Sequence, residues 1–185
     1  MYNVVALIGE SGCGKDTIMQ RILAKYPMYF NKITNCTTRP IRENEINGVN
    51  YFFMNDEEFI KKIEKNEMLE HACFNNWYYG TSLDALLSNC FNIGVFNPTS
   101  IRTMVSNPEV DLTVYRIECD GKTRLLRQLN RELHPNVDEI VRRYCTDKID
   151  FNDLNFPYIS VENIDNEDLD LAVYAIVSDL GLVEA

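Results

Sequence analysis

Apolar and polar residues follow one another along this chain in segments whose spacing predicts strands and helices in turn. The apolar run 3–8 has the length of a buried strand, and apolar residues at helical spacing follow over 18–26, up to Pro27. The same order returns later, with strands expected at 92–96, 112–118 and 158–161 and helices from Pro98 and over 121–131, about 137–149 and 167–180. Such alternation predicts a parallel sheet covered by helices on both faces.

Residues 37–90 depart from this alternation, because short strands and short helices dominate there. We expect strands at 31–36, 51–54, 68–74 and 77–79, a helix from Asn55 to about Lys65, and a short helix capped by Ser82 that runs through Leu87. Asn55 and Glu58 form a variant of the capping box, which satisfies backbone groups at the start of a helix. The segment 37–90 is therefore expected to form a small lobe inserted into the parallel-sheet fold.

A glycine-rich turn stands between the first strand and the first helix. Its residues are Gly9, Glu10, Ser11, Gly12, Cys13, Gly14, Lys15, Asp16 and Thr17. Glycines let successive backbone N–H groups wrap around phosphate oxygens, and the following helix N-terminus adds the positive end of its dipole. Lys15 can reach the terminal phosphates of a nucleoside triphosphate. Strand, turn, helix and lysine together predict a P-loop that binds ATP.

Position 16 departs from the usual P-loop pattern, since Asp16 stands where a hydroxyl normally holds magnesium and Thr17 follows it. A carboxylate is a good ligand for Mg²⁺, and the first turn of a helix favours an anion. We expect Asp16 and Thr17 to hold Mg²⁺ together with ATP. The alternative is that Asp16 only caps the helix, while ATP and water hold the ion.

Two arginines of the inserted segment are candidates for binding a second phosphate. Arg39 and Arg42 lie on a loop stiffened by Pro40, and guanidinium groups match phosphate oxygens in pairs. Tyr51 and Tyr79 supply hydroxyl groups to the same predicted site. The alternative is an ordinary solvated charged loop.

Glu70 is the candidate for recognising a base, because it interrupts an otherwise apolar strand. An ionised carboxylate accepts two parallel N–H bonds, which is the pattern of the N1 and 2-amino edge of guanine. Thr81 could donate to the guanine O6. The alternative is that Glu70 occupies an exposed strand position.

Four further arginines flank a helix break at 132–137. They are Arg127, Arg131, Arg142 and Arg143. A segment that closes arginines over a phosphoryl group would stabilise the charge that develops during its transfer. The alternative is a pair of amphipathic helices with basic solvated faces.

These motifs resemble those of the guanylate kinase family in their order and spacing. Besides the glycine-rich turn, they are Thr37-Thr38-Arg39 with Arg42, Glu45, Asn47-Gly48 and Tyr51, and Glu70-His71-Ala72 with Tyr79-Gly80-Thr81-Ser82. The resemblance covers the first half of the chain, and the second half matches by layout and by Arg127, Arg131 and Arg143. It implies an α/β P-loop three-layer fold with a parallel central sheet, a nucleotide-acceptor lobe at 37–90 and a short lid at about 128–142, within one domain over 1–185.

The resemblance also implies an activity, the transfer of the γ-phosphoryl group of ATP, with Mg²⁺, to a nucleoside monophosphate such as GMP or dGMP. The implied monophosphate-binding residues are Asn35, Arg39, Arg42, Tyr51, Glu70, Tyr79 and Thr81, and the implied catalytic residues are Lys15, Arg127, Arg131 and Arg143. The family usually carries acidic residues where this chain has Val95-Phe96-Asn97. A kinase for another (deoxy)nucleoside monophosphate, and a non-catalytic phosphopeptide-binding module with the same fold, therefore stay open as alternatives.

Composition limits the binding partners and the cellular location that we expect for this chain. The net charge of −10 argues against a general nucleic-acid binder, which needs a basic face. No apolar run approaches the roughly 20 residues of a membrane span. Six cysteines without a C-x-x-C pair, together with the nucleotide loop, indicate free thiols in the cytoplasm. We expect a cytoplasmic monomer or homodimer whose partners are ATP and a nucleoside monophosphate, with no membrane or nucleic acid.

Overall fold

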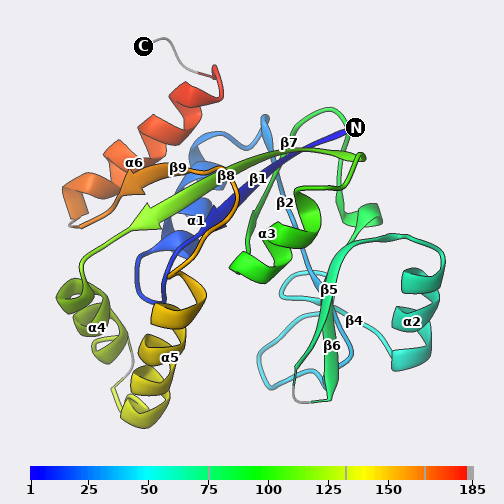
Figure 1. Cartoon of the computed structure of the whole chain (residues 1–185), viewed down its shortest axis with the longest axis horizontal. Helices are drawn as coiled ribbons and strands as arrows, with labels where there is room; N and C mark the ends of the chain where they lie inside the picture. The colour runs from blue at the N-terminus through cyan, green and yellow to red at the C-terminus, as the bar shows by residue number, and fades with distance from the viewer. Residues whose placement is uncertain (75, 132, 165, 183–185) are drawn as a thin grey trace.

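A parallel sheet lies at the centre of the structure, a computed structural model that describes residues 1–74, 76–131, 133–164 and 166–182 (Figure 1). Within these residues the sheet has five strands in the order β2-β7-β1-β8-β9, and each neighbouring pair is parallel. Their bounds are β1 Tyr2–Ile8, β2 Phe30–Lys32, β7 Phe91–Val95, β8 Val110–Glu118 and β9 Ile159–Glu162. The middle strand β1 is buried from Val4 to Ile8, which explains its unbroken apolar run.

Helices cover both faces of this sheet, as the alternation of elements predicts. On one face, α1 (Lys15–Lys25) and α6 (Asn166–Asp179) bury Ile22 and Ile176 against the strands. On the other face, α3 (Pro98–Met104) buries Ile101 against alternate residues of β1. Because successive residues of a strand point to opposite faces, β1 contributes to both cores. The predicted three-layer α/β fold is confirmed.

A second, smaller sheet carries the inserted segment. Its order is β4-β3-β6-β5, and it is mixed, since β3 and β4 are parallel while β6 runs antiparallel to β3 and β5. The bounds are β3 Cys36–Thr37, β4 Phe52–Phe53, β5 Met68–Phe74 and β6 Trp77–Ser82. Leu69 and Leu86 join the core beneath α3, so this lobe packs directly against the main body.

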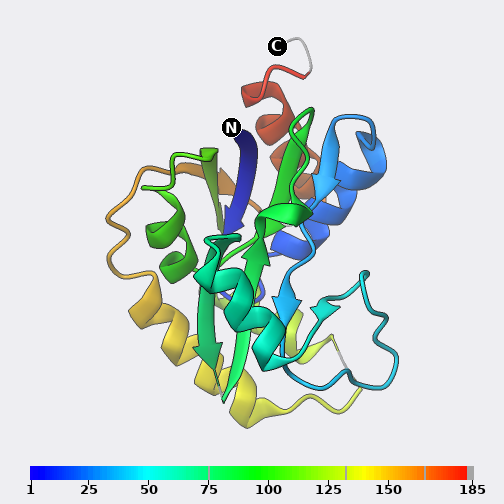
Figure 2. The ribbon, with the colours of Figure 1, turned by 90° about the vertical axis from the view of Figure 1, so that its right-hand side faces the viewer.

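Helix α2 (Asp56–Glu64) covers the small sheet (Figure 2). The predicted capping box is confirmed, because Glu58 N donates to Asn55 Oδ1 at 2.8 Å and Asn55 N donates to Glu58 Oε2 at 3.1 Å. Phe59 is fully buried and stacks on Tyr78 of β6, with 5.3 Å between ring centres. The lobe thus has a small core of its own.

Two expectations about this region are wrong. The predicted strand 31–36 is two strands, because β2 ends at Lys32 in the central sheet and β3 begins at Cys36 in the small one. The predicted helix after Ser82 is a single 3-10 turn, Leu83–Ala85, and the Ser82 hydroxyl donates to Glu67 O at 3.3 Å instead of capping a helix. Strand propensity alone does not show where a chain changes sheets.

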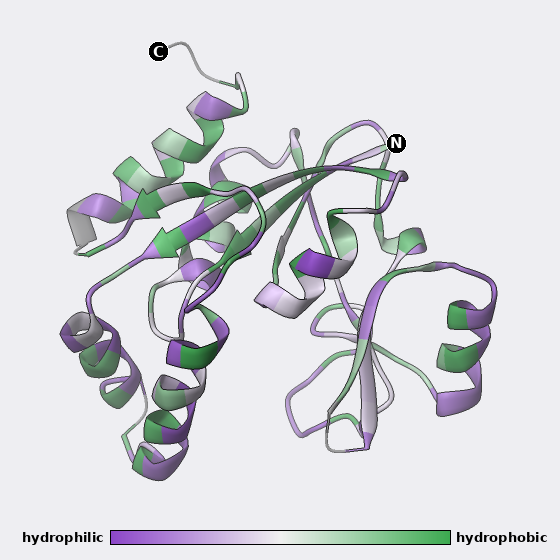
Figure 3. Cartoon of the chain, viewed as in Figure 1, coloured by the Kyte–Doolittle hydropathy of each residue, from purple (hydrophilic) through white to green (hydrophobic). Residues whose placement is uncertain are grey.

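The segment 128–142, for which a lid is predicted, covers the end of α4 (Gly121–Leu129), the start of α5 (Val137–Asp150) and the turn that joins them. Both helices lie beside the carboxyl ends of the central strands, on the opposite side from the small sheet (Figure 1). Hydrophobic and hydrophilic residues mix along α2, α4 and α5, as expected for helices with one exposed face (Figure 3). Helix α4 ends at Leu129, two residues before Arg131, the predicted end of this helix. Glu132 of the predicted helix break lies outside the described residues.

Candidate active site

The glycine-rich turn connects β1 to α1, as predicted. Gly9, Gly12 and Gly14 have φ angles of +146°, +85° and +95°, a region in which side chains other than glycine are strained. A Cβ atom at Gly12 would lie 2.5 Å from the carbonyl oxygen of Arg124 on α4. Glycine is therefore required both by the backbone conformation and by the close approach of α4.

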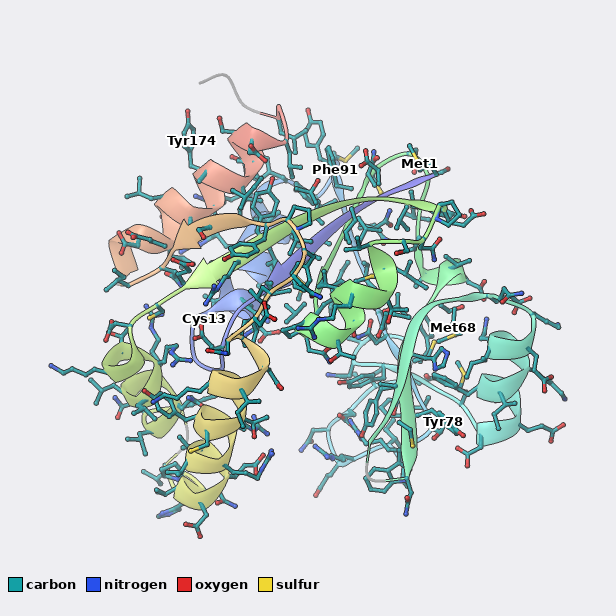
Figure 4. The ribbon with its side chains drawn as sticks, viewed as in Figure 1. Met1, Cys13, Met68, Tyr78, Phe91 and Tyr174 are labelled. Carbon is teal, nitrogen blue, oxygen red and sulfur yellow. The ribbon has the colours of Figure 1, made fainter. Side chains whose placement is uncertain are left out.

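Lys15 begins α1 and turns back onto its own loop. Its Nζ donates to the carbonyl oxygens of Gly9 at 2.7 Å and Glu10 at 3.1 Å. Cys13 lies in the turn between β1 and α1 (Figure 4), and burial raises the pKa of its thiol although the Lys15 ammonium opposes this. A neutral, buried thiol fills space in the loop. The Lys15 ammonium also contacts Cys13 Sγ at 3.6 Å, so its three donors are all taken and a phosphate that reaches Lys15 would replace some of these partners.

One cavity of about 560 Å³ brings together side chains from three separate segments. Its wall includes Lys15, Asp16 and Thr17 of α1, Arg127 of α4, Arg131 of the turn after it and Arg143 of α5. We call it the phosphate cavity. Positive groups that converge on one hollow suit an anion with several charges, such as a triphosphate.

Two of the arginines at this cavity, Arg127 and Arg143, are already held by other groups. Arg127 Nη1 donates to the carbonyl oxygen of Asn163 at 2.9 Å, and its Nη2 donates to that of Ile164 at 3.1 Å. Arg143 Nε donates to Glu139 Oε1 at 2.7 Å, and Glu139 also accepts from Arg142. These arginines lower the pKa of Glu139 to about 2, so it stays ionised near neutral pH.

A second group of predicted residues gathers in the small lobe around Arg39. Its guanidinium is buried, donates to both carboxylate oxygens of Glu45 at 2.8 and 2.6 Å, and lies 5.3 Å from the ring centre of Tyr51. The rings of Tyr51 and Tyr79 are 6.3 Å apart. Arg42 contacts this group through its backbone N–H, which donates to Glu45 at 2.8 Å, while its side chain is exposed.

Glu70 is buried, not exposed, and each of its carboxylate oxygens accepts a hydrogen bond from a hydroxyl group. Thr81 Oγ1 lies 2.9 Å from Oε1 and 3.0 Å from Asn35 Oδ1, so the structure brings these three predicted residues together. Ser100 Oγ donates to Oε2 at 2.7 Å. Ser100 is not among the residues that the sequence predicts for this site. Its only signal is its place in the first turn of the helix that begins at Pro98.

Asp16 lines two cavities, the phosphate cavity and a second one that reaches Tyr51 of the small lobe. Besides the phosphate cavity, it lines a cavity of about 340 Å³ together with Asn35, Tyr51 and Val95. Among the described residues, no three or more His, Cys, Asp or Glu side chains are grouped so that they could hold a metal by themselves. Mg²⁺ in kinase sites needs only one or two carboxylates, and phosphates and water supply the other ligands. Asp16 and Thr17 fit that limited role.

Comparison with known proteins agrees with this arrangement. A family model described as guanylate kinase matches residues 1–92. The guanylate kinase of Malacoplasma penetrans is 33% identical over 147 residues, which cover 76% of this chain and 66% of that protein. The chain belongs to the guanylate kinase family. The guanylate kinase of Mesomycoplasma hyopneumoniae is 44% identical over 81 residues, which cover 44% of this chain and 41% of the relative.

The structural likeness extends over nearly the whole chain. A crystal structure of guanylate kinase from Anaplasma phagocytophilum superimposes with a TM-score of 0.65 at 17% identity, and the match covers 97% of this chain and 85% of that one. At this identity the likeness concerns the fold. The guanylate kinase fold therefore continues through the second half, where the sequence has diverged more. In the described part of the chain, no helix has the length and apolar character needed to cross a membrane.

Proposed function

We propose that this member of the guanylate kinase family transfers the γ-phosphoryl group of ATP to GMP or dGMP. The observation that carries the proposal is the phosphate cavity, in which Lys15 of the P-loop and three arginines meet. Phosphoryl transfer needs little covalent chemistry from the protein. It depends on in-line positioning and on neutralising charge that spreads over the transferred group.

In this proposal the small lobe binds the acceptor nucleotide. Arg39, Arg42, Tyr51 and Tyr79 bind its phosphate, and Asn35, Glu70 and Thr81 recognise its base. Burial and the two hydroxyl contacts hold Glu70 as an oriented acceptor, which supports the assignment to a guanine edge. Segment 37–90 is then the acceptor insertion and about 128–142 the lid of a single domain.

Asp16 and Thr17 would hold Mg²⁺ on the nucleotide, where the ion would neutralise charge on the phosphate oxygens. Lys15 would leave the loop carbonyls to contact the phosphates, while Arg127, Arg131 and Arg143 would keep water away and stabilise the transferred group. The intact glycines and lysine from Gly9 to Lys15 disfavour the non-catalytic phosphopeptide module, which would have no use for Lys15. A cytoplasmic location and a monomeric or dimeric state stay predictions.

The test is a coupled assay of ADP formation from ATP and Mg²⁺ with GMP, dGMP, AMP, CMP and UMP in turn. We expect turnover with GMP and dGMP, identified by the diphosphate product, and the loss of that turnover in Lys15→Ala. A preference for AMP or a pyrimidine nucleotide would show that the base assignment is wrong. No turnover with any monophosphate would contradict the kinase activity itself.

A further inference from the structure

Helices α4 and α5 both hold the P-loop at one residue, Ser11. Asp147 Oδ2 on α5 accepts the backbone N–H of Ser11 at 2.7 Å. Gln128 Nε2 on α4 donates to the carbonyl oxygen of Ser11 at 3.3 Å. Asp147 is 136 positions from Ser11 in the sequence, and Gln128 is 117 positions from it. Both contacts therefore depend on the tertiary structure. Both helices are thus fastened to the nucleotide loop.

Arg124 provides a charged link at the same place. The residue is 4% exposed, and its guanidinium carbon lies 5.1 Å from the ring centre of Tyr144 on α5. Its Nη1 is 3.8 Å from Glu10 on the loop and 4.0 Å from Asp147 on α5. Among the described residues, Nε and Nη1 of Arg124 have no hydrogen-bond partner. A buried positive charge that lacks hydrogen bonds depends on nearby carboxylates, and here they belong to different elements.

Asp147 shares a helix face with one of the candidate catalytic arginines. Arg143 precedes it by four positions, which is about one helical turn, so the two side chains lie one above the other on α5. Arg143 lines the phosphate cavity, while Asp147 binds the loop beside it. Fixing Asp147 therefore fixes the backbone from which Arg143 reaches into the cavity.

We propose that Asp147 is a positioning residue, which docks α5 on the P-loop through the Ser11 N–H and the Arg124 guanidinium and so holds Arg143 at the transferred phosphoryl group. This inference rests on the proposed kinase function. It assigns no contact between Asp147 and substrate. The proposal requires that removal of the Asp147 side chain slow catalysis by displacing Arg143. A role of Asp147 in stability alone would not produce this dependence on Arg143.

The test is a double-mutant cycle on the full chain, with single-turnover rates for ATP and GMP at saturation. The variants are Asp147→Ala, Arg143→Ala and the double variant, with Asp150→Ala as the matched control at an exposed position of the same helix. Misplacement of a catalytic group by about 1 Å can cost roughly 10²-fold, so we expect a loss of that order in Asp147→Ala and no loss in the control. The double variant should be no slower than Arg143→Ala alone, since the two losses share one origin.

Asp147→Asn supplies the conservative rescue. It keeps an oxygen that can accept the Ser11 N–H but removes the charge that faces Arg124, so its rate should fall between those of the wild type and Asp147→Ala. If thermal denaturation shows that Asp147→Ala is not folded, the same cycle is run with Asp147→Asn. Multiplicative losses in the double variant, or a folded Asp147 variant with the wild-type rate, would overturn the positioning role while leaving the kinase function intact. Wild-type protein without turnover would overturn both.

Discussion

Ser100 donates a 2.7 Å hydrogen bond from Oγ to Oε2 of Glu70, and Thr81 contacts the other carboxylate oxygen. The two hydroxyls come from different elements, the first turn of α3 and the end of β6. Contacts on both oxygens restrict rotation of the carboxylate, and each oxygen keeps a lone pair for a ligand. The plane of the carboxylate is thereby set, as the proposed recognition of two parallel N–H groups of a base requires.

The hydroxyl of Ser100 should therefore matter for the acceptor and not for ATP. Loss of one hydrogen bond to a charged group costs about 1.5–3 kcal/mol, and the indirect effect on a ligand should be smaller. We expect Ser100→Ala to raise the KM for GMP several-fold and to leave the KM for ATP unchanged, as measured by steady-state kinetics. Ser106→Ala, in the exposed turn after α3, is the control. Equal changes in both KM values would indicate that Ser100 serves only the stability of α3.

Glu70 itself should decide between guanine and adenine. Glu70→Gln replaces one acceptor oxygen with a donor, which would face the N–H groups of guanine unfavourably. We expect the ratio of kcat/KM for GMP to that for AMP to fall, because unpaired buried polar groups dominate the rejection of wrong substrates. If this ratio is the same as in the wild type, the base is recognised by other residues.

Lys15 should be needed for catalysis and not for folding. We expect Lys15→Ala to lower kcat by orders of magnitude, because the ammonium neutralises charge on the phosphates. Its hydrogen bonds to loop carbonyls are only partly buried, so the melting temperature should change little. Near-normal turnover in a folded variant would contradict the kinase hypothesis.

Arg39 and Arg42 should differ in their effect on stability. Both substitutions to Ala are expected to raise the KM for the monophosphate more than that for ATP, but only Arg39 is buried against Glu45. Arg39 lowers the pKa of Glu45 from 4.5 to about 2. A lowered carboxyl pKa contributes stability above the unfolded value of 4.5, and this is lost as the pH falls towards 2.

We therefore expect the difference in melting temperature between wild type and Arg39→Ala to shrink as the pH is lowered from 4.5 towards 2. Arg42→Ala should show little difference at any pH, because its exposed side chain supplies no comparable contact. A pH-independent difference for Arg39→Ala would mean that packing on Tyr51, and not the ion pair, is what the substitution removes.

Asp16 should set the magnesium requirement. We expect Asp16→Asn to need markedly more Mg²⁺ for half-maximal rate, because a neutral amide is a weaker ligand than a carboxylate. Asp16→Asn combined with Asn97→Asp should recover part of the loss by placing a carboxylate at a position where the resemblance to the guanylate kinase family implies an acid. An unchanged Mg²⁺ titration in the single variant would leave Asp16 with a helix-capping role only.

The sequence predicted most reliably what depends on local pattern. The strand–turn–helix around Gly9 to Lys15 was predictable because its apolar run, glycines and lysine are contiguous. The crossing between sheets at 33–35 was not, because a change of strand partner leaves no mark on alternation. Ser100 and Asp147 were missed for a related reason. Each acts on a residue far away in sequence, and such contacts depend on how helices pack.

The placement of Asp16 on the border of two cavities has a consequence for how the substrates affect each other. One negative charge contributes to the electrostatic potential on both sides, so whatever neutralises it on the donor side also makes the acceptor side less repulsive to a phosphate. Coupling of this kind is reciprocal, since each substrate must change the affinity of the other by the same factor. Without a cation at Asp16, the carboxylate would repel each nucleotide separately, and this source of coupling would be absent.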